Sequence, residues 1–312
     1  MTPPPRQDVV VRVDSPTEAR NPRTGDIDRL STLEVLRLIN TEDHLVPDAV
    51  AAVLPELARA ADLAVGALRA GGRVHYVGAG TSGRLATLDA AELVPTFNAP
   101  PDWFVAHHAG GREALVHAVE DVEDQAASGA AEIRRHASPG DVVLGVTASG
   151  RTPFVVAALA EARLLGARTV LVSNNPTAPA PVDVDVLIAV DTGPEAIAGS
   201  TRMKAGSSQK LVLTSFSTAV MVRLGRTYSN LMVSMRATNA KLRGRTVRIL
   251  REATGLPEHE CTAALADAGG DLKVALVHLL AGVPAARAAE ALESTQGHVR
   301  QALSLLSPGA TG

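Results

Sequence analysis

The strongest constraint on this chain is an alternation of short apolar runs with helical segments between residues 73 and 191. The runs are rich in valine and other strand-forming residues, and most end at glycine, asparagine or aspartate. Strands that alternate with helices are joined by right-handed crossovers, which predicts an α/β fold: a five-stranded parallel sheet with helices on both faces. The five runs are RVHYVGAG (73–80), WFVAHHAGG (103–111), DVVLGVTASG (141–150), TVLVSNNP (169–176) and VDVLIAVD (184–191).

Three parts of the chain differ in pattern. Residues 1–25 are rich in Pro, Arg, Asp and Thr without a period, which predicts a flexible N-terminal arm. Residues 26–245 hold the five runs, a helix predicted over about 47–70, a helix over REALVHAVEDVEDQAA (112–127) and a largely buried helix over 201–224. Residues 246–312 contain short amphipathic segments punctuated by glycine, which predict a small C-terminal helical domain.

Composition excludes several classes of function. The formal net charge is −3, with 30 Lys and Arg against 33 Asp and Glu, so no basic surface for nucleic acid is expected. Cys261 is the single cysteine, which leaves no disulfide framework and no thiolate cluster. The first residues lack the apolar core of a signal peptide, and no long uncharged apolar run is present. We therefore expect a cytoplasmic protein with no membrane partner.

Two of the junctions between a strand and a helix carry the same tripeptide, Ser-Gly-Arg, in GAGTSGR and in TASGRTP. Glycine lets the backbone turn sharply, and a helix N-terminus offers unpaired N–H groups to an anion. Plain helix capping would also explain serine and threonine here. Repetition at the carboxyl ends of two parallel strands favours a phosphate site. The predicted contacts are Thr81, Ser82, Gly83, Ser149, Gly150, Arg151 and Thr152.

The spacing in GAGTSG also matches a dinucleotide fingerprint. That pattern is weak by itself, and the acidic residue expected about 20 residues later is missing, so no NAD site is predicted. Asp89 and Glu92 lie after the first loop, and Glu120 and Glu123 lie after the second run. At this spacing each pair shares a helix face, which is most often a solvated surface. Metal binding near His117 would need further histidine or cysteine ligands, and none is placed, so no metal or other cofactor is expected.

A third polar segment, GPEAIAGSTRMKAGSSQK (193–210), stands where the long buried helix begins. Capping accounts for Ser200 and Thr201, but not for Glu195, Arg202 and Lys204 together. A buried helix rarely opens with so many polar groups unless they meet a ligand or another subunit. Glu195, Ser200 and Lys204 are therefore further candidates for substrate binding.

Together these segments resemble a sugar isomerase (SIS) domain, a phosphosugar-binding fold of flavodoxin-like topology. GPEAIAGSTRMKAGSSQK is similar to the signature shared by N-acetylmuramic acid 6-phosphate etherases and the glucokinase regulatory protein. GAGTSGRLATLDAAELVPTF, HAVEDVED, TASGRTPFV, SNLMVSMRATNAKL and TEARNPRTGDIDRLSTLEVLRLIN resemble etherase segments in the same order, from about residue 17 to 250. The tail resembles the small UBA-like domain of that family. Ser234 departs from the pattern, where an acid is expected, and Trp103 lies in a variable strand.

The resemblance implies a lyase of amino-sugar catabolism and cell-wall recycling. It would convert N-acetylmuramic acid 6-phosphate to N-acetylglucosamine 6-phosphate and D-lactate, by C2 deprotonation, elimination and hydration. It implies a homodimer, no cofactor, and acid/base roles for Glu92 and Glu123. We assign Glu92 as proton donor to the lactate and Glu123 as base, although the reverse is open. Lys204 or Arg202 would hold the lactyl carboxylate or offset charge on the intermediate.

Three other functions remain possible on the sequence. The glucokinase regulatory protein shares the signature but is a sugar-phosphate sensor, built from two such domains in a longer chain. An aldose–ketose phosphosugar isomerase would use the same C2 proton abstraction but release no lactate. A SIS-type transcription regulator would need an N-terminal helix-turn-helix, and the proline-rich start is not one.

Overall fold

A computed structural model describes residues 15–177, 180–235 and 240–307. Its centre is a single sheet of five parallel strands in the order β2-β1-β3-β4-β5, which confirms the predicted α/β class and its flavodoxin-like topology. The strands are β1 (Val74–Gly78), β2 (Phe104–His108), β3 (Val142–Thr147), β4 (Arg168–Ser173) and β5 (Val186–Ala189).

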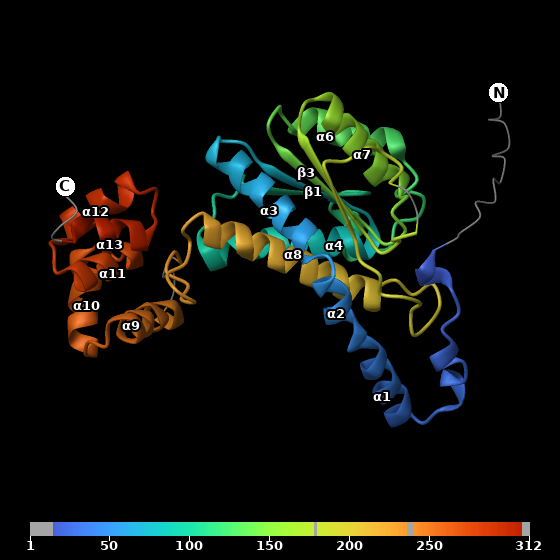
Figure 1. Ribbon diagram of the computed structural model, residues 1–312, viewed down its shortest axis with the longest axis horizontal. Helices are drawn as coiled ribbons and strands as arrows, with labels where there is room; N and C mark the ends of the chain where they lie inside the picture. Colours follow the sequence, from blue (N-terminus) through green and yellow to red (C-terminus); the bar gives the residue numbers. More distant parts are fainter. Residues whose placement is uncertain (1–14, 178–179, 236–239, 308–312) are drawn as a thin grey trace.

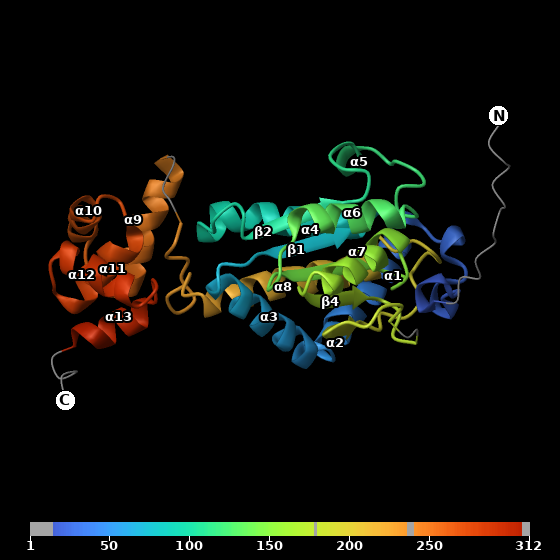
Figure 2. The same cartoon turned by 90° about the horizontal axis from the view of Figure 1, so that it is seen from above.

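Both faces of the sheet are covered by helices, as predicted (Figures 1 and 2). Strand side chains alternate between two separate cores, so that Val74 and Tyr76 of β1 pack on one face and Val77 on the other. The first face carries α3 (Leu54–Arg69), α4 (Gly80–Phe97) and α8 (Lys204–Arg223), and the second carries α6 (Ala126–His136) and α7 (Pro153–Leu164).

The order of the strands decides where a ligand can bind. From β1 the chain moves outward to β2 on one side, while β3 pairs with β1 on the other side. At such a switch point the connections leave the sheet in opposite directions and open a crevice at the carboxyl ends of the strands. The turn from β1 into α4 and the turn from β3 into α7 therefore border the same space.

The N-terminal helices differ from the sequence expectation in one respect. Instead of one helix over about 47–70, the chain forms α2 (Leu45–Ala51) and α3, separated at Ala52 and Val53. Before them, α1 (Thr32–Asp43) begins with a capping box between Ser31 and Glu34. In Figure 1, α1 projects away from the sheet, and Leu33 and Leu36 on it are more than half exposed. Residues exposed in this way leave an apolar surface that a further chain could cover.

Residues 15–25 are packed rather than loose, while residues 1–14 of the predicted arm lie outside the described residues. They form the short 3₁₀ turns Pro16–Glu18 and Pro22–Thr24, followed by Ile27–Arg29. Thr24 donates a 2.8 Å hydrogen bond to the carbonyl of Ala196, and Thr17 is 1% exposed. The polar composition was a poor guide here, because these side chains satisfy backbone groups of the loop before α8.

A third hydrophobic core lies in the C-terminal part (Figure 1, orange to red). Its helices are α9 (Ala240–Thr254), α10 (Glu258–Asp267), α11 (Leu272–Ala281), α12 (Ala285–Ser294) and α13 (Val299–Leu306). The predicted boundary at 245/246 falls inside α9, and Val233 already packs in this core. Among the described residues no single helix is long and apolar enough to cross a bilayer; α11 and α12 reach that length together but bend by 109°.

Candidate functional site: a pocket at the carboxyl ends of β1 and β3

A cavity of about 420 Å³ lies between the two strand-to-helix turns. Its wall is made mainly of backbone, hydroxyl groups and carboxylates, with one arginine. This is the wall expected for a polar ligand that carries an anionic group. The side chains and turns around it are Ser15, Thr17, Glu18, Ala79, Gly80, Thr81, Ser82, Glu123, Asp124, Val146, Thr147, Ala148, Ser149, Arg151, Thr152, Pro153, Asn175 and Thr201.

Two glycines bring the start of α4 close to β1. A Cβ atom on Gly83 would lie 2.6 Å from the carbonyl oxygen of Gly78, and a Cβ on Gly78 would lie 2.7 Å from the nitrogen of Gly83. Neither position accepts a side chain, so Gly83 packs the helix against the strand instead of lining the cavity. Gly80 has φ of +53°, which turns the chain from the strand into the helix. Thr81 and Ser82 then line the pocket at the first turn of α4.

The turn after β3 supplies a cluster of hydroxyl groups. The Thr147 hydroxyl lies 2.7 Å from that of Thr152 and 3.2 Å from that of Ser149, which also accepts a hydrogen bond from the Arg151 nitrogen. Gly150, with φ of +73°, shapes the turn and is not part of the wall. Asn175 at the end of β4 donates to the carbonyl of Ser149 and holds this turn in place.

Both turns lead into helices whose first N–H groups have no partner within the helix. The partial positive charges of two helix N-termini therefore meet across the cavity, together with the hydroxyl groups of Ser82, Ser149 and Thr152. Arg151, which is exposed, adds a full positive charge at the rim. These features suit the pocket to an anionic group such as a phosphate.

Glu123 reaches this pocket from an irregular segment and not from a helix. The helix predicted over 112–127 is limited to α5 (Glu113–Val116), and α6 begins only at Ala126. Asp121 adopts a positive φ of 61°, so the expectation that Glu120 and Glu123 share a helix face is wrong. Val122 is partly buried against the core on the face of the sheet that α6 and α7 cover.

Two contacts hold this segment over the pocket. The carbonyl of Glu123 accepts a 3.0 Å hydrogen bond from the nitrogen of Phe154 in the first turn of α7. Arg84 of the first Ser-Gly-Arg tripeptide donates to the carbonyls of Ala114, Leu115 and His117 at 2.8 to 3.1 Å. Arg84 therefore fixes the backbone of α5 and its end at His117, from which the segment that carries Glu123 continues.

Replacing Arg84 by alanine should release the segment that carries Glu123 while leaving the hydroxyl cluster intact. We expect kcat for the reaction proposed below to fall about 100-fold, because a displacement of about 1 Å is enough for such a loss. KM should stay within about threefold of the wild-type value. Steady-state kinetics of Arg84→Ala beside Arg112→Ala, an exposed arginine of the same region, would check this. An equal loss in both variants would contradict the role of Arg84.

Glu92 does not line the pocket. It is exposed on α4, twelve residues after Gly80, which at 1.5 Å per residue is about 18 Å along the helix. Asp89, one turn earlier, points the other way into the core. It accepts hydrogen bonds from Tyr76 (2.9 Å) and Ser217 (3.0 Å). Burial raises the pKa of Asp89 to about 6, against the smaller opposing effect of these hydrogen bonds.

The raised pKa of Asp89 makes stability depend on pH. An unfolded aspartate titrates near pH 3.9, so the folded chain binds the proton more tightly, and stability falls as the pH rises from about 4 to about 6. Between pH 4.5 and 7.5 the free energy of unfolding should drop by about 2 kcal/mol through this group. Asp89→Asn should remove that change. Urea unfolding of the wild type and of Asp89→Asn at both pH values would test this prediction. An equal change in the free energy of unfolding with pH in the two proteins would contradict it.

Glu195 and Lys204 lie under the site and not in its wall. The carboxylate of Glu195 accepts hydrogen bonds from the backbone nitrogens of Lys204 (2.8 Å) and Ala205 (2.9 Å), so it caps the first turn of α8. Burial raises the pKa of Glu195, partly offset by these two bonds. The Lys204 ammonium lies 2.8 Å from Glu42, and both side chains are 1% exposed or less. Ser200 is half-buried and outside the pocket wall.

Several residues of the wall were missed by the sequence reasoning. Thr17, Glu18 and Thr201 come from segments far apart in the chain, and the turn after β4 contributes Asn175. Gly199 donates to the carbonyl of Thr17, which joins the N-terminal segment to the start of α8. The resemblance of the segment from Thr17 onward to etherases indicates that these residues matter. It does not predict that the segment packs against the start of α8.

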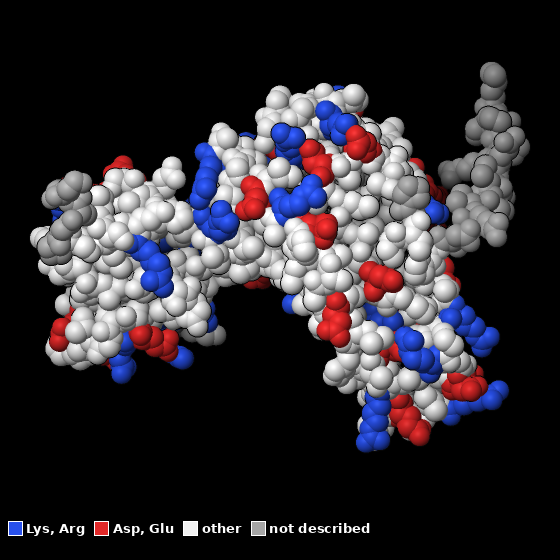
Figure 3. Space-filling model, in the orientation of Figure 1, with Lys and Arg blue, Asp and Glu red and all other residues white. Residues whose placement is uncertain are grey.

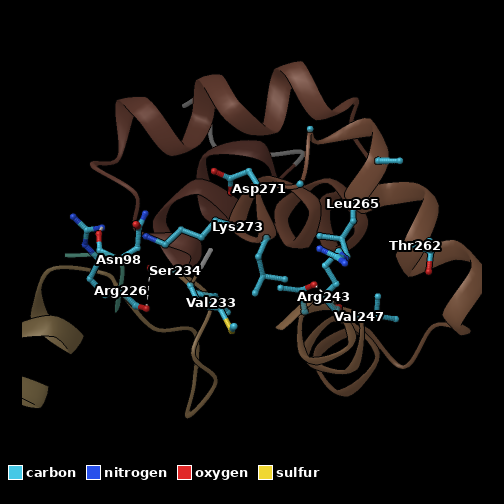
Figure 4. A pocket seen from close by; sticks show the side chains of 16 residues that line it. Asn98, Arg226, Val233, Ser234, Arg243, Val247, Thr262, Leu265, Asp271 and Lys273 are labelled. Atoms are coloured by element: carbon cyan, nitrogen blue, oxygen red, sulfur yellow. Dashed lines mark hydrogen bonds between the residues drawn. The ribbon is translucent and has the colours of Figure 1, made fainter. Parts of the chain in front are cut away.

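A larger cavity, of about 950 Å³, lies away from these turns (Figure 4). It separates the end of the sheet domain, at Asn98 and Arg226, from the helices of the C-terminal part. Lys273 bridges the two, donating to the carbonyls of Gly225 (2.7 Å) and Gly297 (2.9 Å). Burial lowers the pKa of Lys273 to about 8. We regard this space as a junction between domains, since it lacks a carboxylate pair and paired helix N-termini.

The fold and the phosphate-type pocket together define a SIS domain. A family model described as the N-terminal SIS domain of the glucokinase regulatory protein matches residues 56–163. Among solved structures, a phosphoheptose isomerase from Francisella tularensis is similar at 19% identity and a TM-score of 0.49, covering 62% of this chain and all of that one.

Three curated relatives are each named N-acetylmuramic acid 6-phosphate etherase. The protein from Thermobifida fusca is 63% identical over 268 residues, covering 86% of this chain and 88% of the relative. That from Symbiobacterium thermophilum is 55% identical, with coverage of 86% and 89%. That from Serratia proteamaculans is 48% identical over 288 residues, with coverage of 92% and 97%. The chain belongs to the N-acetylmuramic acid 6-phosphate etherase family.

Proposed function

We propose that this protein cleaves the D-lactyl ether of N-acetylmuramic acid 6-phosphate and releases N-acetylglucosamine 6-phosphate and D-lactate. The observation that carries the proposal is a carboxylate, Glu123, in the wall of a pocket built from two phosphate-type turns. Relatives at 48 to 63% identity bear the name of this activity. We place the enzyme in the cytoplasm, in amino-sugar catabolism, in line with the sequence expectation.

In this proposal the phosphate sits between the two turns. The hydroxyl groups of Ser82, Ser149 and Thr152 donate hydrogen bonds to the phosphate oxygens, and the helix N-termini add hydrogen bonds from backbone N–H groups. Anchoring this group positions the reacting carbons of the sugar, which spares the entropy of finding the productive orientation. Arg151 at the rim offers a further cation for the phosphate or for the lactyl carboxylate.

The chemistry needs one base and one acid. Opening of the sugar ring exposes an aldehyde at C1, which acidifies the hydrogen on C2. Glu123 removes that proton, the C3–oxygen bond breaks, and lactate leaves with a proton from Glu92. Water then adds to C3 after giving a proton back to Glu92, and Glu123 returns its proton to C2. The sum is one water consumed, with both carboxyl groups restored.

Glu92 can take part only if something brings it to the pocket, and a second copy of the chain would do so. Around Glu92, α4 exposes a face that includes Leu88 (55% exposed) one turn earlier, with Ala91 and Pro95 also exposed. In a two-fold dimer that pairs two antiparallel α4 helices, the last turns of one face the first turns of the other. An axis near Leu88 therefore puts the partner subunit's Glu92 against α4 near Arg84, about one helical turn from Thr81 and Ser82 in the pocket wall. We propose such a homodimer.

Activity is tested by incubating the protein with N-acetylmuramic acid 6-phosphate and EDTA and measuring D-lactate enzymatically. Release of lactate supports the etherase. Saturable binding of sugar phosphates without lactate would favour a sensor, and conversion of an aldose phosphate without lactate would favour an isomerase.

The shared site is tested by co-expressing Glu92→Gln and Glu123→Gln chains with different tags and purifying the mixture. Half of randomly assembled dimers are hybrids, each with one intact site, so about a quarter of the wild-type activity should return. Each variant expressed alone should be inactive. A hybrid with no activity would contradict a site divided between subunits. It would not contradict the proposed etherase activity, which the lactate assay on the wild type tests.

A further inference from the structure

A buried row of polar side chains crosses the sheet on the face covered by α6 and α7, apart from the phosphate pocket. It runs from Asp141, just before β3, through His75 of β1 and His107 of β2 to Glu132 of α6. The first three side chains are at most 4% exposed. His75 Nε2 lies 3.1 Å from Asp141 Oδ2, His75 Nδ1 lies 3.0 Å from His107 Nε2, and His107 Nδ1 lies 3.3 Å from Glu132 Oε1.

Hydrogen-bond chemistry decides the direction of this row. The Asp141 carboxylate also accepts from the backbone nitrogens of Arg73 and Ser138, both at 2.8 Å, so it is an acceptor throughout. His75 must therefore donate from Nε2 to Asp141, which leaves its Nδ1 as an acceptor. His107 then donates from Nε2 to His75. Its Nδ1 keeps a lone pair and faces a carboxylate oxygen, so two acceptors meet at the end of the row.

A third group stands at the same place. His136 follows Glu132 by one helical turn, and its Nδ1 lies 3.5 Å from Glu132 Oε1. One nitrogen of His107, one of His136 and one oxygen of Glu132 all lie within 4.8 Å of one another. Tetrahedral zinc binds such atoms at about 2.0 to 2.1 Å, which separates neighbouring ligand atoms by about 3.3 Å. The 3.3 Å between His107 Nδ1 and Glu132 Oε1 matches that spacing.

We propose that His107, Glu132 and His136 bind a divalent first-row transition metal ion such as zinc. Two imidazole nitrogens and one carboxylate oxygen are borderline ligands of the kind these ions prefer, and His136, 40% exposed, leaves a side open for water. A cation placed between His107 Nδ1 and Glu132 Oε1 would bind both lone pairs and so remove the repulsion between these two acceptors. The ion would fasten the edge strand β2 to α6.

The rest of the row then serves as the outer shell of the site. A metal-binding histidine usually donates its other N–H to an acceptor that fixes its orientation. His107 does so to His75, which is held in turn by Asp141.

Two features at the site compete with the ion. Arg135 donates to Glu132 Oε2 at 2.9 Å, which occupies the second carboxylate oxygen and leaves Oε1 for the metal. His136 Nδ1 lies 2.8 Å from the carbonyl oxygen of Glu132. If Nδ1 donates its proton there, Nε2 keeps the lone pair for the ion.

Binding is measured on the full-length protein, freed of metal with EDTA and dialysed. Calorimetric titration with zinc chloride should show one equivalent bound per chain. Cobalt(II) should give the intense visible absorption of a tetrahedral site. His136→Ala and Glu132→Gln, both at the solvent end of the row, should weaken binding at least tenfold. His259→Ala, an exposed histidine on α10, should bind like the wild type.

The test of the metal site does not depend on the proposed etherase activity. Lactate release should be the same with EDTA and with zinc, because the ion lies on the α6 face and not in the pocket. The proposal is overturned if zinc binding saturates at less than one equivalent per chain. It is also overturned if the cobalt(II) spectrum is that of the hydrated ion, or if His259→Ala weakens zinc binding as much as His136→Ala.

Discussion

Glu123→Gln should lower kcat for D-lactate release at least about 1,000-fold while the protein still binds the sugar phosphate. Glu123 is exposed in the pocket wall, so the change removes a base without opening a cavity in the core. A positioned acid or base typically contributes about 10²- to 10⁴-fold, and in the proposed mechanism Glu123 is the base that starts the reaction. Glu120→Gln, three residues earlier in the same irregular segment and outside the pocket wall, is the matched control and should stay within about threefold of wild type.

Hydrogen exchange at C2 of the substrate distinguishes the role of Glu92 from that of Glu123. In heavy water, a protein that retains its base but lacks the acid should exchange the C2 hydrogen of the substrate without releasing lactate. We expect this exchange from Glu92→Gln and none from Glu123→Gln, followed by NMR. The opposite pattern would reverse the assignment. Exchange by both variants would remove Glu123 and Glu92 from the role of base.

Lys204→Met should destabilise the protein by about 3 kcal/mol or more. The Lys204 ammonium and the Glu42 carboxylate form a buried pair at 2.8 Å, and removing Lys204 takes away one of the groups that compensate the buried charge of Glu42. Arg23 and Asn21 still donate to Glu42, which keeps the loss at the lower end of the usual range of about 3 to 5 kcal/mol. Urea unfolding followed by circular dichroism gives the value.

The matched control is Lys210→Met, an exposed lysine on the same helix, which should change the free energy of unfolding by less than about 0.5 kcal/mol. Combining Lys204→Met with Glu42→Gln should recover part of the loss, since neither buried charge of the pair remains and Arg23 is half exposed to water. If Lys204→Met alone cost less than about 1 kcal/mol, the pair would not hold α1 to α8, and a direct role for Lys204 in substrate binding would regain weight.

Local pattern was enough for much of the fold and part of the site. The five strands, their parallel arrangement and the covering helices follow from apolar runs that alternate with helical periodicity. Thr81, Ser82, Ser149, Arg151 and Thr152 could be placed together because the carboxyl ends of neighbouring parallel strands lie at one edge. These features depend on residues close in sequence, where propensity and periodicity act directly.

The irregular segment around Glu123 shows where such reasoning ends. Its spacing suited a helix, but Val122 packs against the core and Arg84 binds three carbonyls of the preceding turn. Each of these contacts joins residues far apart in the chain. Their free energy exceeds the small differences in local propensity on which a sequence prediction depends.

The sequence by itself determined the class of fold, the two phosphate turns and the family. Only the tertiary structure decided which of the polar residues meet. It placed Glu195 and Lys204 in the buried support of α8, and it brought Thr17 and Thr201 to the pocket. Glu123 lines that pocket, whereas Glu92 lies outside its wall, farther along α4. Residue type and spacing determine what a short segment can form, whereas the partner of a buried charge is set by which distant segments pack against it, because that packing must compensate its lost hydration.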